Sequence, residues 1–315
     1  MNRRSFHRHG LALLAAPLAG HAHSPSAGLS AALWQSLERR SQGRLGVAVL
    51  DTRTGTLIGH RLEERFPMCS TFKWLAAAST LQRVDAGQEQ LDRLIRYSAD
   101  RLLPHSPITA QHVGAGMTLA ALCDATITVS DNAAANLVLE SLGGPSALTA
   151  YARRLGDVAT RLDRWEPELN EATPGDPRDT TTPQAMATLL KTTTLGDALT
   201  PDSRTRLIEW LRGSRTNASR LGAHVPAGWQ LGSKTGSGPR GTTNDVGVYW
   251  TPSRAAIVVA VYLTESTASE AVRDGVIAAV AQAVTGFVST TWSTSFVTSV
   301  APALAGQRRP QDTTA

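Results

Sequence analysis

The order of apolar and polar residues predicts strands near the two ends of the chain and helices between them. Residues 45–50 and 56–60 are short apolar runs typical of strands, and the turn-rich segment 51–55 joins them into a hairpin. From about residue 66 to residue 211 apolar residues recur at helical spacing, interrupted by loops that contain Pro and Gly. Strand patterns return at 229–237, 245–251 and 255–264, and further helical patterns cover 29–40 and 269–287.

This arrangement predicts an α+β fold. We expect an antiparallel sheet of about five strands, built from both termini with flanking helices, and an inserted all-helical domain, because short connections among the last three strands favour antiparallel pairing. The α/β domain is expected to be discontinuous, over residues 24–61 and 213–290, with the helical domain at 62–212. Residues 291–315 are rich in Ser, Thr and Pro and are expected to form a flexible tail.

The first 22 residues have the features of a signal peptide. Arg3 and Arg4 precede a weakly apolar run from Leu11 to Ala19, and small residues follow it at a cleavage site. Paired arginines followed by Phe6 favour export by the twin-arginine route, with a Sec signal as the alternative. We therefore expect a periplasmic protein whose leader is removed.

Charge and hydropathy exclude some classes of partner. Loss of the leader removes three arginines from the net charge of +5 and leaves +2, which gives no reason to expect binding to nucleic acid. We expect no stretch after the leader to reach the roughly 18 apolar residues of a membrane span, and therefore no membrane anchor. Nothing in the sequence requires an oligomer, and we expect a monomer.

The chemistry begins at Ser70, where a predicted helix starts and Lys73 follows one turn later. Residues three apart lie on the same helical face, so the hydroxyl and the amine are neighbours. A serine activated by a nearby amine is a known nucleophile design, although Ser-x-x-Lys alone also describes a helix cap followed by a solvated lysine. The chain has 31 basic residues, of which only Lys73, Lys191 and Lys234 are lysines. Unlike arginine, a buried lysine can lose its proton, which favours a chemical role for Lys73.

Two further motifs are weak separately and specific together. Ser130-Asp131-Asn132 precedes an Ala-rich helix and also suits a helix cap, and Lys234-Thr235-Gly236-Ser237 continues an apolar strand. There Gly236 would let a ligand lie against the strand edge. The three motifs in this order resemble the serine β-lactamase and penicillin-binding protein superfamily, over about residues 24–288.

A fourth motif favours the class A β-lactamases. Glu166-Pro167-Glu168-Leu169-Asn170 lies in a polar, Pro-containing segment at 161–179, and class A enzymes carry Glu-x-x-Leu-Asn in such an omega loop. In the family an arginine and an aspartate pair at the ends of this loop, and Arg164 and Asp179 stand at matching positions. The Glu166–Pro167 peptide bond is a candidate for the cis form.

The resemblance implies a catalytic role for four residues. Ser70 would be the acylated nucleophile, with the backbone N–H groups of Ser70 and Ser237 as the oxyanion hole. Lys73, Glu166 or both would take the proton of Ser70, and Glu166 would activate the water that releases the acyl group. Ser130 would pass a proton to the departing lactam nitrogen.

The resemblance also implies a set of residues that bind the substrate. Asn132 would bind the acyl-amide side chain, Asn170 would hold the water, and Lys234 and Thr235 would bind the carboxylate. Arg220 would supply a second carboxylate contact and His105 a stacking contact at the cleft entrance. The positions named for substrate binding are Asn132, Asn170, Lys234, Thr235, Gly236, Ser237, Arg220 and His105.

Some positions depart from the family pattern. Many relatives place an arginine on the strand after Lys-Thr-Gly, and we expect Asn244 to occupy that position. Cys69 together with Arg220 is similar to carbapenem-hydrolysing members, but Gly238 stands where those have a second cysteine. Cys69 and Cys123 could form a disulfide in an exported protein, although nothing in the pattern brings them together.

The implied reaction hydrolyses the β-lactam amide of penicillins and cephalosporins without a cofactor. The histidines lack ligand spacing, so we expect no metal and exclude a zinc-dependent enzyme. Two alternatives remain open: a penicillin-binding DD-peptidase, and a β-lactam sensor that stays acylated. Glu166 and the expected absence of a membrane segment argue against both.

Overall fold

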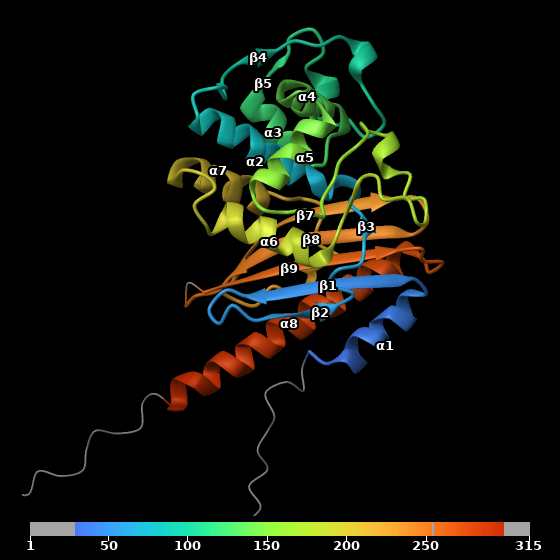
Figure 1. Cartoon of the computed structure of the whole chain (residues 1–315), viewed down its shortest axis with the longest axis vertical. Helices are drawn as coiled ribbons and strands as arrows, with labels where there is room; N and C mark the ends of the chain where they lie inside the picture. Colours follow the sequence, from blue (N-terminus) through green and yellow to red (C-terminus); the bar gives the residue numbers. More distant parts are fainter. Residues whose placement is uncertain (1–28, 254, 299–315) are drawn as a thin grey trace, which may run out of the picture.

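A five-stranded antiparallel sheet forms the middle of the molecule in the computed structural model, which describes residues 29–253 and 255–298. Its strands are β1 (Arg44–Asp51), β2 (Leu57–His60), β7 (Gln230–Gly238), β8 (Thr242–Trp250) and β9 (Ala256–Thr264). They are ordered β2-β1-β9-β8-β7, so strands from the two ends of the chain pair in one sheet (Figure 1). The predicted α+β class, hairpin and antiparallel pairing are confirmed. The expected leader lies outside the described residues.

Both faces of the sheet are covered, because successive side chains of a strand point to opposite faces. In β1, Val47 and Val49 pack with helices α1 (Ala31–Ser41) and α8 (Glu270–Thr298). Ala48 and Leu50 instead belong to the larger core that lies under the helical region. Figure 1 shows α1 and α8 together on one side of the sheet.

Helix α8 corrects two expectations. It continues through Thr298, so the tail does not begin at residue 291, and only residues 299–315 of it lie outside the described part. Ser and Thr suggested a loop there, but no Gly or Pro interrupts residues 287–298. The segment Glu270–Val288 is also long and apolar enough to cross a membrane, and 44% of it is buried within the fold. A core helix that packs on a sheet passes the same test.

The residues between β2 and β7 are mainly helical. The helices are α2 (Phe72–Asp85), α3 (Leu119–Thr128), α4 (Asn132–Leu142), α5 (Pro145–Arg154), α6 (Pro183–Thr194) and α7 (Pro201–Arg212). Every residue of α2 from Phe72 to Leu81 is buried, so this helix forms the centre of the region and carries even polar side chains into the interior. The division at residues 62 and 212 into two domains remains our interpretation.

Short elements connect the helical region to the site. Two small antiparallel pairs join β3 (Phe66–Pro67) to β6 (Thr180–Thr181) and β4 (Leu94–Ile95) to β5 (Met117–Thr118). The 3-10 turns are η1 (Cys69–Thr71), η2 (Ala99–Arg101), η3 (Thr109–Gln111), η4 (Glu168–Asn170) and η5 (Leu221–His224). The first pair brings the chain just before Ser70 beside the end of the 161–179 loop.

Candidate active site

Ser70 lies in turn η1, immediately before α2. The helix therefore begins two residues later than predicted, although Ser70 remains at its amino-terminal end. The turn is closed by Thr71, whose backbone N–H and hydroxyl both donate to the carbonyl of Met68, at 3.2 Å and 2.9 Å. Unpaired N–H groups at a helix start favour negative charge, so the position suits an alkoxide and an oxyanion.

Lys73 is fully buried and contacts three acceptors from other segments. Its Nζ lies 2.9 Å from the carbonyl oxygen of Ser130, 2.5 Å from Oδ1 of Asn132 and 3.0 Å from Oε1 of Glu166. The side chains of Lys73 and Glu166 are both 0% exposed. The structure therefore joins three of the four sequence motifs at one amine.

Ser130 connects the two lysines of the site. Its hydroxyl oxygen accepts from Lys234 Nζ at 3.0 Å and lies 3.4 Å from Lys73 Nζ. Burial lowers the pKa of Lys73, against the opposing effect of the Glu166 charge. Burial also lowers the pKa of Lys234 well below its usual value, and the neighbouring Lys73 charge adds to that shift. Two buried positive charges beside one hydroxyl repel each other, which favours the loss of a proton from one of the two amines.

Glu166 is held in place by its backbone as well as its carboxylate. The side-chain amide of Asn136 donates to the Glu166 carbonyl at 2.9 Å and accepts from its N–H at 3.0 Å. Asn170 Nδ2 donates to Oε2 of Glu166 at 2.5 Å. The Glu166–Pro167 peptide bond is cis, as the sequence suggested.

Two buried oxygens beside this pair lack a hydrogen-bond donor among the described residues. They are Oε1 of Glu166 and Oδ1 of Asn170. Lys73 Nζ lies 3.0 Å from Oε1 as an ion pair. The two oxygens can therefore accept the two O–H groups of one water molecule.

The 161–179 loop is closed by Arg164 and Asp179, as predicted. Arg164 Nε donates to Oδ2 of the buried Asp179 at 2.6 Å, and Oδ1 accepts from the N–H groups of Asp163 and Arg164 at 2.8 Å and 3.0 Å. One carboxylate thus collects three donors, and the loop that carries Glu166 is fixed at both ends.

The predicted carboxylate-binding residues gather along β7. Arg220 is 5% exposed and its Nε pairs with Asp274 at 2.7 Å, while Nη2 donates to the Ser237 hydroxyl at 2.8 Å. Thr235 shares a 2.6 Å hydrogen bond with Thr216. Arg220, Ser237 and Thr235 therefore lie at one end of the site, as expected.

The expectation for Asn244 was wrong. Its side chain is fully buried and donates to the carbonyls of Pro67 and Met68, on the side of the sheet away from the Arg220 guanidinium. The register instead places Thr243 opposite Ser237, so by alternation Thr243 lies on the Arg220 side. Neighbouring residues of a strand point to opposite faces, so an error of one residue in the expected position assigns the side chain to the wrong face.

Gly236 and His105 have contacts that the sequence did not indicate. A Cβ at Gly236 would lie 2.7 Å from the Met68 carbonyl oxygen and 3.2 Å from the Ser70 nitrogen, so glycine lets β7 pack against the turn η1 itself. His105 is exposed, with its Nε2 2.9 Å from the Val129 carbonyl oxygen, and its own carbonyl accepts from the Asn132 N–H. His105 thus lies beside Asn132 at the rim.

The two cysteines are buried and free. Burial raises the pKa of both thiols, that of Cys123 to about 12. Within residues 29–253 and 255–298, no three His, Cys, Asp or Glu side chains are grouped to hold a metal ion.

Sequence reasoning missed Asn136 and the wider role of Asp131. Asn136 lies one helical turn after Asn132 on α4, and this i, i+4 spacing could have indicated that it faces the same site. Asp131 caps α4 through the Ala134 N–H at 2.9 Å and also accepts from the N–H groups of Ile108 and Thr109. It therefore fixes the 104–109 segment beside the site, which no local pattern indicates.

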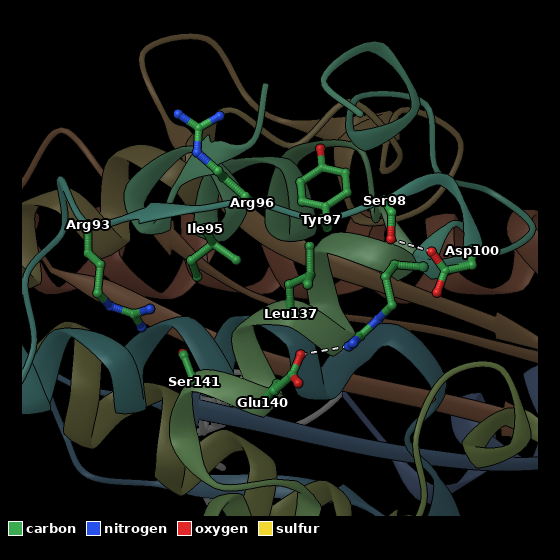
Figure 2. A pocket seen from close by; sticks show the side chains of 10 residues that line it. Arg93, Ile95, Arg96, Tyr97, Ser98, Asp100, Leu137, Glu140 and Ser141 are labelled. Carbon is green, nitrogen blue, oxygen red and sulfur yellow. Dashed lines mark hydrogen bonds and ion pairs between the residues drawn. The ribbon is translucent and has the colours of Figure 1, made fainter. Parts of the chain in front are cut away.

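A cavity of about 470 Å³ lies away from these residues. It is lined by the 93–101 segment and by Leu137, Glu140 and Ser141 of α4 (Figure 2). A neighbouring hollow of about 360 Å³ is lined by Asn136 and Trp165 among others. Neither contains Ser70, Lys73 or Ser130, so the catalytic assignment depends on side-chain geometry and not on cavity size.

Comparisons with known proteins show which family the chain belongs to. Residues 29–288 match the Beta-lactamase enzyme family. The chain is 45% identical to the carbapenem-hydrolyzing beta-lactamase KPC of Klebsiella oxytoca, over 86% of this chain and 93% of that protein. It is 44% identical to beta-lactamase CTX-M-8 of Citrobacter amalonaticus, over 87% and 93%.

Solved structures give the same result. The ancestral GNCA class A beta-lactamase is 61% identical, with a TM-score of 0.79 over 81% of this chain and 99% of that chain. The putative class A beta-lactamase PenP from Rhodopseudomonas palustris is 56% identical, also with a TM-score of 0.79 over 81% and 99%.

Asp179→Asn should loosen the 161–179 loop, because it removes a charge that accepts three hydrogen bonds in a buried position. We expect the free energy of unfolding to fall by about 2 kcal/mol. Asp176→Asn is the control, since this carboxylate lies in the same loop, is partly exposed and pairs with Arg178. Urea unfolding measures both variants, and equal losses would contradict the special role of Asp179.

Asp245 predicts a pH dependence of stability. It is fully buried across from Thr235, its Oδ2 accepts from the Leu221 N–H at 3.1 Å, and burial raises its pKa to about 7. Between about pH 4, where the unfolded carboxyl titrates, and pH 7, the native state keeps a proton that the unfolded state releases. This group's stabilising contribution is therefore complete below about pH 4 and is lost as the pH rises to 7.

Asp245→Asn removes that titration. The free energy of unfolding of the variant minus that of the wild type should increase between pH 5 and pH 8, by on the order of 2 kcal/mol. Urea unfolding at the two pH values measures it. A difference that stays constant would contradict the raised pKa.

Proposed function

The chain belongs to the Beta-lactamase enzyme family as a class A serine β-lactamase, an enzyme that hydrolyses β-lactams and so gives antibiotic resistance, and we propose that its reaction proceeds through an acyl-enzyme on Ser70. The observation that carries the proposal is the buried contact of 3.0 Å between Lys73 and Glu166 beside that serine. This contact supports a proton acceptor close to the proposed nucleophile and close to the proposed hydrolytic water.

In the first half of the reaction Ser70 attacks the lactam carbonyl. Moving one proton across the Lys73–Glu166 contact interchanges the charged and the neutral form of the pair, so the two residues act as one coupled base for the Ser70 proton. The backbone N–H groups of Ser70 and Ser237 stabilise the oxyanion, and the close packing of Gly236 on η1 supports their placement.

The lactam nitrogen must gain a proton as its bond to the carbonyl carbon breaks. Ser130 is suited to supply it, because its hydroxyl lies between the amines of Lys73 and Lys234, which can replace the proton. Lys234, Thr235 and Arg220 bind the substrate carboxylate at the same end of the site. Asn132 binds the amide of the acyl side chain, with His105 at the rim.

In the second half water hydrolyses the ester. Oε1 of Glu166 and Oδ1 of Asn170 are both acceptors without a hydrogen-bond donor among the described residues, and they suit a water placed between them. As the oxygen of that water attacks the ester carbonyl, Glu166 takes one proton of the water. The Ser70 oxygen regains its proton when the ester bond breaks. A penicillin-binding peptidase or a sensor lacks this second half.

The proposed substrates are penicillins and cephalosporins. The relative named as carbapenem-hydrolyzing shares 45% of its aligned residues with this chain, but Gly238 here provides no second cysteine beside Cys69. A Cβ at residue 238 would lie 2.7 Å from Cys69 Sγ, so the two positions are adjacent. We propose that the enzyme is exported to the periplasm and works there as a monomer, without a cofactor or a membrane partner.

Glu166→Ala should trap the acyl-enzyme, because the site then keeps its nucleophile and loses the base for water. After mixing with a penicillin, intact-protein mass spectrometry should show a mass increase equal to the β-lactam. Turnover should fall by a factor of about 1,000 or more.

Two controls accompany this experiment. Glu168→Ala changes an exposed carboxylate of the same loop and should turn over like the wild type. Ser70→Ala should neither acylate nor hydrolyse. Rapid turnover by Glu166→Ala would contradict the role assigned to Glu166, and acylation of Ser70→Ala would contradict that of Ser70.

A further inference from the structure

Cys69, the residue before the nucleophile, has a backbone conformation that it would not adopt freely. Its φ is +46°, in the left-handed region, and its side chain is fully buried. For a residue with a Cβ this conformation costs about 1–3 kcal/mol, so surrounding contacts must hold it. Because Cys69 determines the direction of the chain into Ser70, those contacts also determine where the Ser70 hydroxyl lies.

Asn244 provides two of the contacts that hold this turn, beside the Met68 N–H bond to the Asp179 carbonyl at 2.9 Å and the contact between the Thr71 and Tyr262 hydroxyls at 3.1 Å. Its Nδ2 donates to the carbonyls of Pro67 and Met68, at 2.9 Å and 3.1 Å, and its Oδ1 accepts from the N–H of Leu263 on β9 at 3.2 Å. The amide is fully buried, so all three bonds form without competition from water. We propose that Asn244 is a positioning residue for Ser70 that keeps the Cys69 turn in its left-handed form.

The Met68 carbonyl shows why one amide has this effect. It accepts from the Thr71 N–H, from the Thr71 hydroxyl and from Asn244, so it connects the turn η1 to strand β8. Thr71 belongs to the turn itself, and its hydroxyl also lies 3.1 Å from the Tyr262 hydroxyl on β9. Asn244 belongs to the sheet, and therefore fixes the turn relative to β7 and Ser237.

The backbone of Asn244 faces the other half of the site. Its carbonyl accepts from Arg220 Nη1 at 3.0 Å, and the same Nη1 donates to the Gly236 carbonyl at 3.1 Å. One residue therefore contacts the nucleophile turn through its side chain and the proposed carboxylate-binding arginine through its backbone. This sets the distance between the attacked carbonyl and the bound carboxylate of a substrate.

The inference rests on the proposed acyl-enzyme mechanism and separates its two halves. Glu166 and Asn170 are held by Asn136 and by the Arg164–Asp179 pair, and Asn244 has no recorded contact with any of them among the described residues. Loss of the Asn244 amide should therefore slow acylation and leave deacylation nearly unchanged.

The test compares Asn244→Asp with Thr242→Val in the full enzyme. Asn244→Asp keeps the acceptor for Leu263 and puts a carboxyl oxygen in place of the donor to the turn. Thr242→Val removes a buried 2.9 Å hydrogen bond to Thr264 between the same two strands, without contact to η1. Stopped-flow acylation with a chromogenic cephalosporin and decay of the acyl-enzyme mass give the two rate constants, each normalised to titrated active sites.

We expect Asn244→Asp to lower the acylation rate constant by a factor of about 10 to 100 and to change deacylation less than about threefold. Thr242→Val should change neither rate by more than about threefold. Adding Cys69→Gly should recover part of the lost acylation rate, because glycine adopts a left-handed conformation without being held. If Asn244→Asp does not fold, Asn244→Ser takes its place, because its single, shorter hydroxyl cannot make both bonds to the turn.

Two results would overturn the inference. One is an Asn244 variant whose acylation and deacylation both equal those of the wild type, which would make Asn244 a residue for stability alone. The other is equal slowing of both steps without recovery by Cys69→Gly. Failure of the wild type itself to acylate on Ser70 would instead reject the proposed function, so the two failures are distinguishable.

Discussion

The structure depends on one buried ion pair, between the ammonium of Lys73 and the carboxylate of Glu166. The two side chains are 0% exposed and approach to 3.0 Å, although they come from a central helix and a surface loop. Removing two charges from water is costly, and their attraction offsets that cost only when further hydrogen bonds satisfy the remaining donors and acceptors. Ser130, Asn132 and Asn170 supply those bonds, and we propose a role in the reaction for each of them.

The backbone around the pair is correspondingly strained. Cys69, His105, Ser130 and Asp179 all have positive φ without being glycine, and all lie beside the site or at the end of its loop. Such conformations persist only where the surroundings determine them fully. Here the surroundings are the buried helix α2, the sheet under η1 and the loop closed by Asp179. The rigid parts of the fold therefore hold a site that would relax if it stood alone.

The sequence indicated the candidate site residues better than the residues that hold them in place. Ser70, Lys73, Ser130, Glu166 and Lys234 belong to short motifs that the resemblance to class A β-lactamases could assign to one site, and the structure brings Lys73, Ser130, Glu166 and Lys234 together. Asn136 and Asp131 act across segments 20 to 30 residues apart, and such contacts arise only when the helices pack.

Asn244 was assigned to the wrong face, since one residue decides which side of a strand a side chain faces. The strands themselves were predicted within about three residues, and the apolar runs of β1, β8 and β9 are buried on both faces. Helix α8 exceeded its prediction because Ser and Thr, unlike Gly and Pro, do not end a helix.

The most direct test of this account is a double-mutant cycle on the stability of the Lys73–Glu166 pair. The free energies of unfolding of the wild type, Lys73→Met, Glu166→Gln and the double variant are measured by urea unfolding at neutral pH. If the two charges sustain each other in the interior, the second substitution should recover about 2 kcal/mol or more of what the first one loses. Additive effects, within about 0.5 kcal/mol, would contradict the coupling on which the description of the site rests.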